Sequence, residues 1–431
     1  MKYYLIPVFF LVATLLAAQN KIETLNNDGA WCWFSDPRAI YISGDEQEII
    51  TGWVKLDGSI EISMLNLETG KTKTEIVYDK LEYDDHDNPS FLQLSDNNLM
   101  VFYAKHCALN MYWNKSSLNK DSLFGKVITY DPISESELER YPHRQVTYAN
   151  PYQLTNENNR IYVFGRWTGF KPNIMWSDDN GETFTKSKVF IAEEGFRASN
   201  RPYVKYYSDG ISRIHIIMTD GHPRKEATNS VYYAYYENKA FWRMDGSKIC
   251  NLDEIPFKPT DATVVYKATE TTGRAWVYDI IADKKGNPTI LYARYPSEKE
   301  HLYYYANYDG KKWHDNLICN SGKWFPQTPE GKTEPEPHYS GGMTIHPLKH
   351  NIVYVSKEVD GVFEIEKYVT NDDGETWDIT PITSNSKNDN VRPYVPRNMT
   401  KKDKTVLLWM ENEKYIHYTN FKSSIKYIIE D

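Results

Sequence analysis

Two segments of the chain share one pattern: Ser177–Phe184 reads SDDNGETF, and Thr370–Trp377 reads TNDDGETW. Both have the form Ser/Thr-x-Asp-x-Gly-x-Thr-aromatic, where x is any residue. The aspartate can accept hydrogen bonds from the amides of a turn, and glycine readily adopts the positive φ that tight turns need. The pattern therefore predicts a β-hairpin turn at each position, with the aromatic side chain packed below it.

This pattern resembles the Asp-box hairpin of β-propellers, which is structural and carries no chemistry. Each copy follows the aromatic end of a predicted strand, and similar strand-and-turn units occur at Ser63, Met111, Tyr232, Tyr303 and Tyr415. The spacing of these seven units, about 50–70 residues, suits four-stranded blades with loop insertions. We therefore predict an all-β fold, a single seven-bladed β-propeller of four-stranded antiparallel blades. Six or eight blades are the alternatives.

Short segments of alternating polar and apolar residues, separated by Asp, Asn and Gly, make up most of the chain. Ser134–Arg140 is the exception, and it predicts one or two helical turns. A propeller closes by pairing its last strands with its first blade. We expect Ala30–Phe34 and Ala39–Ile42 to meet Val406–Met410 and Tyr415–Tyr418.

The chain begins MKYYLIPVFFLVATLLAAQN, in which one lysine, an apolar run and two alanines precede the polar Gln19. This is the layout of a secretory signal peptide. We expect residues 1–18 to be removed and residues 19–431 to be exported as one catalytic propeller domain, periplasmic or secreted. The apolar run is too short for a comfortable membrane span, and no later segment resembles one.

The composition limits the classes of ligand. A formal net charge of −9 argues against nucleic acid, which would need a basic face. An anionic sugar needs only a local basic pocket, and the 34 tyrosines and 12 tryptophans could stack on sugar rings as well as favour strands. The four cysteines, Cys32, Cys107, Cys250 and Cys319, fit neither a zinc ribbon nor a redox pair. We expect mostly buried thiols, with at most one bridge or metal contact.

His86 and His106 lie twenty residues apart and flank a predicted hairpin. Phe91–Leu94 and Leu99–Tyr103 are its strands, and the polar residues 95–98 form the turn. Because a hairpin brings its ends together, the two histidines should lie near one another. Three aspartates and one asparagine surround His86 in the sequence. Two imidazoles rimmed by carboxylates favour proton transfer or metal binding over strand capping.

Tyr148 and Arg166 flank a second hairpin in the same way. Corresponding hairpin ends of a propeller fall on the same face, so the four side chains could converge. The alternatives are simple aromatic packing for Tyr148 and a buried ion pair for Arg166.

Further candidates would bind the substrate rather than transform it. Arg201, Tyr203 and Lys205 share one face of a strand by alternation. His222, in a tight turn, is expected to bind substrate or, with lower odds, a structural cation. The complete substrate-binding set is Asn88, Asn150, Arg201, Tyr203, Lys205 and His222. The segment His338-Tyr339-Ser340 is expected to line the same face, with no specific role assigned to it.

Several motifs make the chain resemble the seven-bladed propeller ulvan lyases and their relatives in the bacterial-neuraminidase-repeat class. They are GAWCWFSDPRAIY (29–41), HDNPSF (86–91), FYAKH (102–106), TYANPYQL (147–154), RIYVFGRW (160–167), NRPYVKY (200–206) and SRIHIIMTDGHPR (212–224). The resemblance covers the first half of the chain well and the second half through its propeller character. Matched motif to motif, it implies that His86, His106, Tyr148 and Arg166 occupy the catalytic positions.

The activity that this resemblance implies is β-elimination at C4–C5 of a glucuronate or iduronate in ulvan, a sulfated algal polysaccharide, or in its oligosaccharides. Arg166 and His106 suit neutralisation of the uronate carboxylate, which makes the C5 proton acidic. His86 and Tyr148 suit removal of that proton and protonation of the leaving O4. The scheme needs no metal or cofactor, although a structural cation stays open. The expected partner is an anionic saccharide, and the expected state is a monomer.

Three other functions remain open. A dehydratase would eliminate water from the non-reducing-end uronate of ulvan oligosaccharides by the same chemistry. A glycoside hydrolase of the rhamnosidase or sialidase type would need a different site, and Trp33–Arg38 resembles the start of a sialidase only loosely. A sugar-binding propeller without catalysis is the third.

Overall fold

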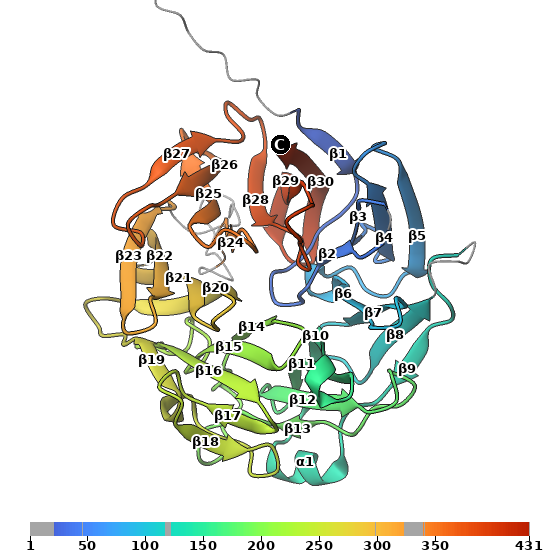
Figure 1. The fold of residues 1–431 in the computed structure, drawn as a ribbon, viewed down its shortest axis with the longest axis vertical. Coiled ribbons are helices and arrows are strands. Elements are labelled where there is room, and N and C mark those ends of the chain that lie inside the picture. Colours follow the sequence, from blue (N-terminus) through green and yellow to red (C-terminus); the bar gives the residue numbers. More distant parts are fainter. Residues whose placement is uncertain are drawn as a thin grey trace, which may run out of the picture.

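The computed structural model describes residues 21–430, apart from residues 45, 117–121, 298, 323–338 and 340. Its strands form seven antiparallel sheets, arranged as blades around a central axis (Figure 1). The predicted seven-bladed all-β propeller is confirmed. Within the described residues, no helix is both long enough and apolar enough to cross a membrane. The predicted signal peptide, residues 1–18, lies outside the described residues.

In every blade except the last, the strands follow one another along the chain, and the first of them is the innermost. The first blade consists of β2 (Ala39–Ile42), β3 (Glu48–Val54), β4 (Ile60–Asn66) and β5 (Thr72–Tyr78). The second consists of β6 (Ser90–Gln93), β7 (Leu99–Ala104), β8 (Met111–Ser116) and β9 (Ile128–Tyr130). The third consists of β10 (Arg144–Leu154), β11 (Arg160–Thr168), β12 (Pro172–Ser177) and β13 (Lys188–Val189). The fifth blade consists of β20 (Arg274–Ala282), β21 (Pro288–Ser297), β22 (Glu300–Tyr308) and β23 (Trp313–Asn320). The sixth consists of β24 (Met343–Ile345), β25 (Ile352–Val359), β26 (Val362–Val369) and β27 (Asp378–Pro381).

The fourth blade departs from the predicted four strands. It contains β14 (Val204–Ser208), β15 (Arg213–Thr219), β16 (Val231–Glu237), β17 (Ala240–Trp242) and β18 (Lys248–Asn251), and β19 (Thr263–Tyr266) pairs with β16. The other blades keep four strands.

The only α-helix among the described residues is α1 (Glu135–Arg140), and the hydroxyl of Ser134 caps it by accepting from the amide of Glu137. The helical turn predicted at 134–140 is therefore confirmed. Three 3₁₀ turns are η1 (Asp85–Asp87), η2 (Thr155–Glu157) and η3 (Pro259–Asp261).

The two Asp-box turns have the predicted geometry. In the first, Asp179 accepts from the amide of Thr183 at 2.9 Å, and Gly181 has a φ of 82°. Phe184 packs against Trp113 of the preceding blade, with ring centroids 5.1 Å apart. In the second, Trp377 packs on Tyr305 of its preceding blade in the same way. Each box therefore joins neighbouring blades, and the seven predicted units all fall in different blades.

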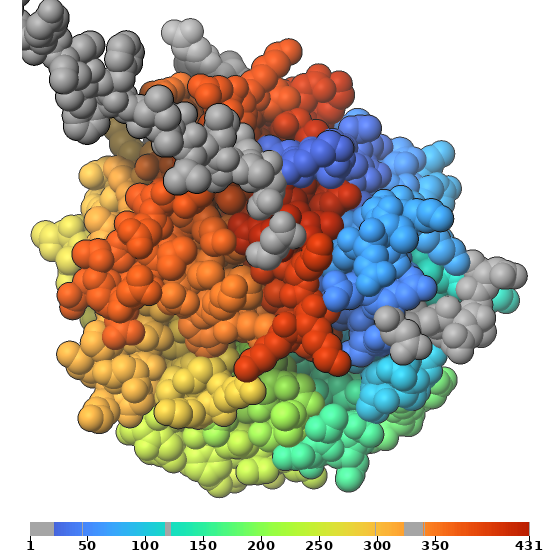
Figure 2. Space-filling model, turned by 45° about the horizontal axis from the view of Figure 1, so that its top comes forward, coloured from blue at the N-terminus to red at the C-terminus, as the bar shows by residue number. Residues whose placement is uncertain are grey.

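The chain closes the ring with a strand that the sequence did not indicate. β1 (Glu23–Asn26) pairs with β30 (Asn420–Glu430), so the last blade has the order β28 (Asp389–Tyr394), β29 (Thr405–His417), β30, β1. Figure 2 shows the blue N-terminal residues directly against the red C-terminal blade. The expected strands do pack together in one core, but through side chains. The expected contact is confirmed, although residues 30–34 form no strand and only Ala30 makes an isolated bridge, to Val54.

Instead, residues 32–38 form a central segment that crosses the axis of the ring. Asn88 from the second blade accepts from the amide of Cys32, and the indole of Trp33 donates to the carbonyl of Val277 in the fifth blade. Contacts with blades on opposite sides place this segment inside the channel. The four cysteines are all free: Cys32 is buried and the other three are half-buried.

Candidate active site

The two histidines of the first hairpin stack on one another. His86 lies in η1 before β6, and His106 lies in the turn after β7. Their ring centroids are 4.1 Å apart and their planes differ by 9°. The prediction that the hairpin brings them together is confirmed.

One carboxylate holds both rings. Oδ1 of Asp84 lies 2.7 Å from Nδ1 of His86, and Oδ2 lies 2.9 Å from Nδ1 of His106. An ionised carboxylate can only accept hydrogen bonds, so the Nδ1 atom of each ring carries a proton. Both tautomers are thus set by Asp84, and the Nε2 atoms remain for other contacts.

A second carboxylate adds to the negative charge beside His86. Oδ1 of Asp85 lies 3.1 Å from Nδ1 of His86, and Oδ2 accepts from the buried Arg392 at 2.6 Å. Burial is the largest single effect and disfavours the charged imidazole, but the interactions with Asp84, Cys32 and Asp85 together outweigh it and hold the pKa of His86 well above its usual range. His86 is therefore an imidazolium at neutral pH.

Tyr148 reaches the site through an irregular strand pairing. The register of β10 against β11 shifts between Arg144 and Thr147 and again between Thr147 and Asn150. Tyr148 has a φ of 66°, which is uncommon for an aromatic residue. Such a bulge re-aims the side chain that it carries. Burial raises the pKa of the Tyr148 hydroxyl well above its usual value, so it keeps its proton at neutral pH.

Arg166, on β11, connects the two hairpins. Its guanidinium donates to the hydroxyl of Tyr203 at 2.6 Å and contacts Nε2 of His106 at 3.3 Å. Because a guanidinium has only donors, Nε2 of His106 must accept, and His106 is neutral in this arrangement. Nε of Arg166 is buried without a hydrogen-bond partner among the described residues. The arginine thus retains donor capacity for an anion.

A cavity of about 470 Å³ lies over these residues. It is lined by Phe34, His86, His106, Tyr148, Arg166, Ala198, Ser199, Arg201, Tyr203, His222, Arg224, Lys225, Trp276, Tyr339 and Tyr418. Three arginines, one lysine and three histidines are among these, and no carboxylate is among the described lining residues. The lining favours an anionic ligand.

Three predicted substrate-binding residues lie on the wall contributed by the fourth blade. The guanidinium of Arg201 lies 3.6 Å from the ring centre of Phe170. Tyr203 packs edge-on against His222, with centroids 5.1 Å apart. Burial and nearby arginines, Arg166 first, lower the pKa of His222 to about 3, so its imidazole is neutral.

The other three predicted binding residues do not line this cavity. Asn88 and Asn150 hold the central segment through hydrogen bonds to its backbone. Lys205 is buried, donates to the carbonyl of Trp33 and forms an ion pair with Asp36. Period-two alternation predicted that Lys205 and Tyr203 share a face, but Tyr203 lines the cavity whereas Lys205 pairs with Asp36 in the channel. The alternation pattern could not show that a step of two residues along an inner strand leads from the cavity into the channel.

Sequence reasoning gave little weight to Tyr339, yet its hydroxyl lies 3.0 Å from Nε2 of His86. Its neighbours His338 and Ser340 lie outside the described residues. Trp276 and Tyr418 also line the cavity and carry no signal beyond being aromatic. Arg224 and Lys225 lie two and three residues after the predicted His222, and their positive charge was the signal available in the sequence.

Two groups of described residues bring three potential metal ligands within 4.8 Å: Asp84 with His86 and His106, and Cys32 with Asp85 and His86. Both groups use His86, whose Nδ1 already donates to Asp84 and lies 3.1 Å from Oδ1 of Asp85. The structural cation proposed near His222 stays a prediction.

Comparison with known proteins places the chain among propellers. The model of the BNR repeat-containing family matches residues 49–320. A polysaccharide lyase described as a PL25 ulvan lyase, bound to -[GlcA(1-4)Rha3S]-, is similar over 94% of this chain and 95% of that one, with 12% identity and a TM-score of 0.71. The polysaccharide lyase Uly1 is similar over 95% and 98%, with 11% identity and a TM-score of 0.56.

No curated protein sequence matches significantly. At such low identities the structural similarities show a shared fold. The family model, in contrast, spans more than half of the sequence. The chain belongs to the BNR repeat-containing family.

Proposed function

We propose that the protein is a carbon–oxygen lyase that breaks the C4–O4 bond of a uronate by β-elimination. The observation that carries this proposal is one cavity that combines Arg166, free of any carboxylate partner, with two histidines and Tyr148. A lyase of the same fold bound to a glucuronate-containing ligand supports it.

Arg166 supplies the charge that makes the C5 proton acidic. That proton lies next to a carboxylate, and its removal places negative charge on the carboxylate oxygens. A guanidinium already oriented by Tyr203 and His106 stabilises this charge without reorganising during the reaction.

The two proton transfers fall to Tyr148 and His86. Tyr148 first loses its hydroxyl proton to solvent, a loss that the nearby charge of Arg166 favours. The phenolate then takes the C5 proton, the C4–O4 bond breaks, and a C4–C5 double bond forms. His86, which is charged at rest, donates its Nε2 proton to the departing oxygen. Where proton and leaving group lie on the same side of the ring, Tyr148 can return the proton itself.

A hydrolytic mechanism is less well supported by this site. Most glycoside hydrolases flank the scissile bond with a pair of carboxylates. Asp84 and Asp85 lie behind the histidines instead, and both are nearly fully buried.

Product analysis tests the proposal. Purified protein is incubated separately with polymeric ulvan and with saturated ulvan oligosaccharides. A lyase yields products that absorb in the ultraviolet, because the new double bond is conjugated to the carboxylate, and the polymer shortens. A dehydratase yields the same chromophore from oligosaccharides with loss of one water from the mass. Saturated products would contradict elimination and indicate hydrolysis.

We further propose that the protein is exported and meets its anionic substrate outside the cytoplasm. The apolar N-terminal run supports this. Mass spectrometry of the protein from its native host should find a chain that begins near residue 19, and an intact Met1 would contradict export through cleavage.

A further inference from the structure

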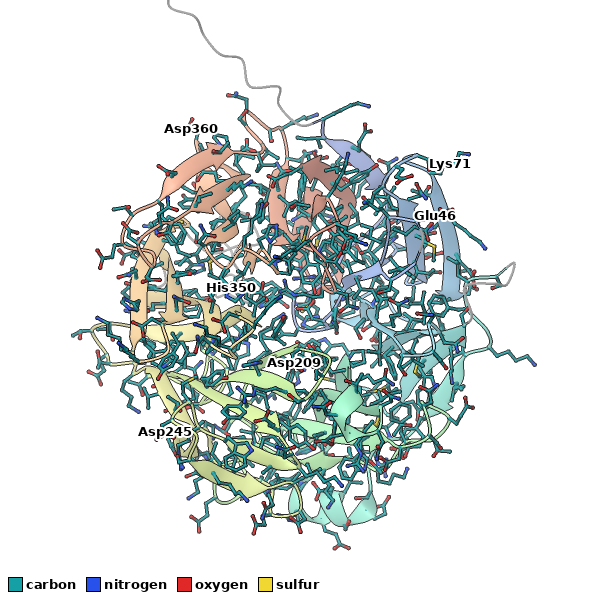
Figure 3. All side chains as sticks on the ribbon, in the orientation of Figure 1. Glu46, Lys71, Asp209, Asp245, His350 and Asp360 are labelled. Atoms are coloured by element: carbon teal, nitrogen blue, oxygen red, sulfur yellow. The ribbon has the colours of Figure 1, made fainter. Side chains whose placement is uncertain are left out.

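A second cavity of about 470 Å³ lies at the other end of the channel. Its walls are the ends of β2, β6, β10, β14, β24 and β28, the innermost strands of six blades, together with the loops that follow them. His106 and His222, in contrast, lie in loops that follow second strands. Since neighbouring strands are antiparallel, these two sets of loops lie at opposite ends of the blades. Asp209, near the centre of the ring in Figure 3, marks the second cavity.

The central segment separates the two cavities. Phe34 lines the catalytic cavity, whereas Asp36 and Pro37 line the second one. The backbone of this segment is held by Asn88 and Asn150. The two cavities are therefore distinct binding spaces with different walls.

The second cavity differs from the first in charge. Its charged lining residues are Asp36, Asp209 and Arg397. Asp36 is paired with Lys205, and Arg397 with the buried Asp279. The remaining carboxylate, Asp209, accepts from backbone amides of its own loop, including those of residues 211–213. The lining therefore offers no unpaired positive charge, and Asp209 adds one carboxylate held by amides, which disfavours an anionic ligand.

The polar and aromatic groups of this lining suit a sugar ring. Five aromatic side chains contribute, among them the half-buried Tyr207 and the buried Tyr152, Tyr206 and Tyr394. Four side-chain amides and four hydroxyl groups of serine or threonine also line this cavity. Aromatic faces with polar edges match a pyranose, which has an apolar face and a rim of hydroxyls.

Tyr394 gives an independent sign of a missing partner. Its side chain is 1% exposed, and its hydroxyl has no hydrogen-bond partner among the described residues. The guanidinium groups of Arg38 and Arg397 lie 4.4 and 5.1 Å from its ring centre. The ring is thus held in place, while a buried hydroxyl that normally finds a partner is left for a ligand.

We propose that this second cavity binds an uncharged pyranose unit of a saccharide. The site is independent of the elimination reaction, since none of its lining residues lines the catalytic cavity. Tyr207 provides the stacking face, and Tyr394 provides a hydrogen bond.

The test uses the full-length protein with two probes, methyl α-L-rhamnopyranoside and sodium glucuronate, followed by saturation-transfer NMR and calorimetry. Tyr207→Ala should weaken methyl rhamnoside binding by about tenfold or more through loss of the stacking face, and leave glucuronate binding intact. Arg166→Ala should do the reverse.

Leu348→Glu provides a second variant that does not threaten the fold, because Leu348 lines the cavity and is 43% exposed. It should also weaken methyl rhamnoside binding. Absence of methyl rhamnoside binding to the wild type would overturn the proposal. So would methyl rhamnoside binding that is lost in Arg166→Ala and retained in both Tyr207→Ala and Leu348→Glu. Absence of turnover of ulvan and its oligosaccharides by the wild type would count against the lyase proposal and not against this site.

Discussion

Arg166 is the residue on which the proposed elimination depends most. It is buried, contacts His106 and Tyr203, and keeps a donor without a described partner. Arg166→Ala should lower kcat/KM by about 10²–10³ or more, because the substrate carboxylate would remain uncompensated. Ultraviolet absorbance of the product measures the rate, and an unchanged Tm of the variant shows that the fold is retained. Near-normal turnover would place the site elsewhere.

A substitution of Tyr148 should distinguish substrate binding from the chemical step. Tyr148→Phe keeps the ring that lies 5.2 Å from the guanidinium of Arg166 but removes the hydroxyl. We expect the Kd for glucuronate to stay within about threefold, while kcat falls by about 10²–10⁴, the usual contribution of a proton-transfer group. Calorimetry and stopped-time product assays give the two values. A parallel loss of binding would instead assign Tyr148 to packing.

The charge of His86 predicts a pH dependence. As the proton donor it must be charged, so activity should fall on the alkaline side as His86 loses its proton. Asp84→Asn removes the carboxylate that holds the pKa of His86 high, and burial then lowers that pKa. The alkaline limb of kcat should therefore move to lower pH.

Asp87→Asn is the matched control for Asp84→Asn. Asp87 is also buried, and burial together with nearby Asp84 and Glu82 raises the pKa of its carboxyl well above the usual range. Its carboxyl is already largely neutral, so an amide changes little charge. If both variants shift the alkaline limb equally, His86 is not the group that sets it.

At the scale of elements, the second Asp-box turn offers a test of how blades are joined. Gly374 and Gly361 lie in the same blade and have φ values of 90° and 89°. A Cβ on Gly374 would lie 2.8 Å from Cδ1 of Tyr305 in the preceding blade, whereas a Cβ on Gly361 would meet nothing within 4 Å. Both alanine variants share the backbone cost, but only Gly374→Ala adds a clash.

We therefore expect Gly374→Ala to destabilise the protein by about 1–3 kcal/mol more than Gly361→Ala, the usual cost of overpacking. Thermal unfolding of both variants measures the difference. Equal Tm values would mean that the Asp-box turn contributes no contact between blades.

The β10–β11 hairpin shows which element features escape sequence patterns. Both strands could be predicted from their apolar residues, and so could the positions of Tyr148 and Arg166 at their ends. The bulge that gives Tyr148 its positive φ has no local signal, because no glycine or asparagine marks that residue. Only the packing of both strands against their neighbours selects it.

For the whole molecule, closure of the ring depends on four residues near the N-terminus. β1 covers the edge of β30, and a strand edge without a partner leaves backbone groups unpaired. A variant that starts at residue 27 should have a Tm about 1 °C or more below that of a variant starting at residue 21, as expected for a loss of about 1 kcal/mol in a chain of this length. Equal Tm values would show that β1 does not contribute to closure.

By itself, the amino-acid sequence determined the all-β class, the seven blades, the Asp-box turns and the pairing of His86 with His106. These features depend on neighbouring residues: alternation sets strands, glycine and aspartate set turns, and a short hairpin joins its own ends.

Only the tertiary structure decided which polar residues face the cavity and which face the channel. Lys205 and Arg201 look alike in sequence, yet one is paired with Asp36 inside the channel and the other lines the cavity. Likewise, Tyr339 meets His86 although 253 residues separate them. The physical reason is that burial and charge partners come from strands distant in sequence, and these partners determine both the direction and the ionisation of a side chain.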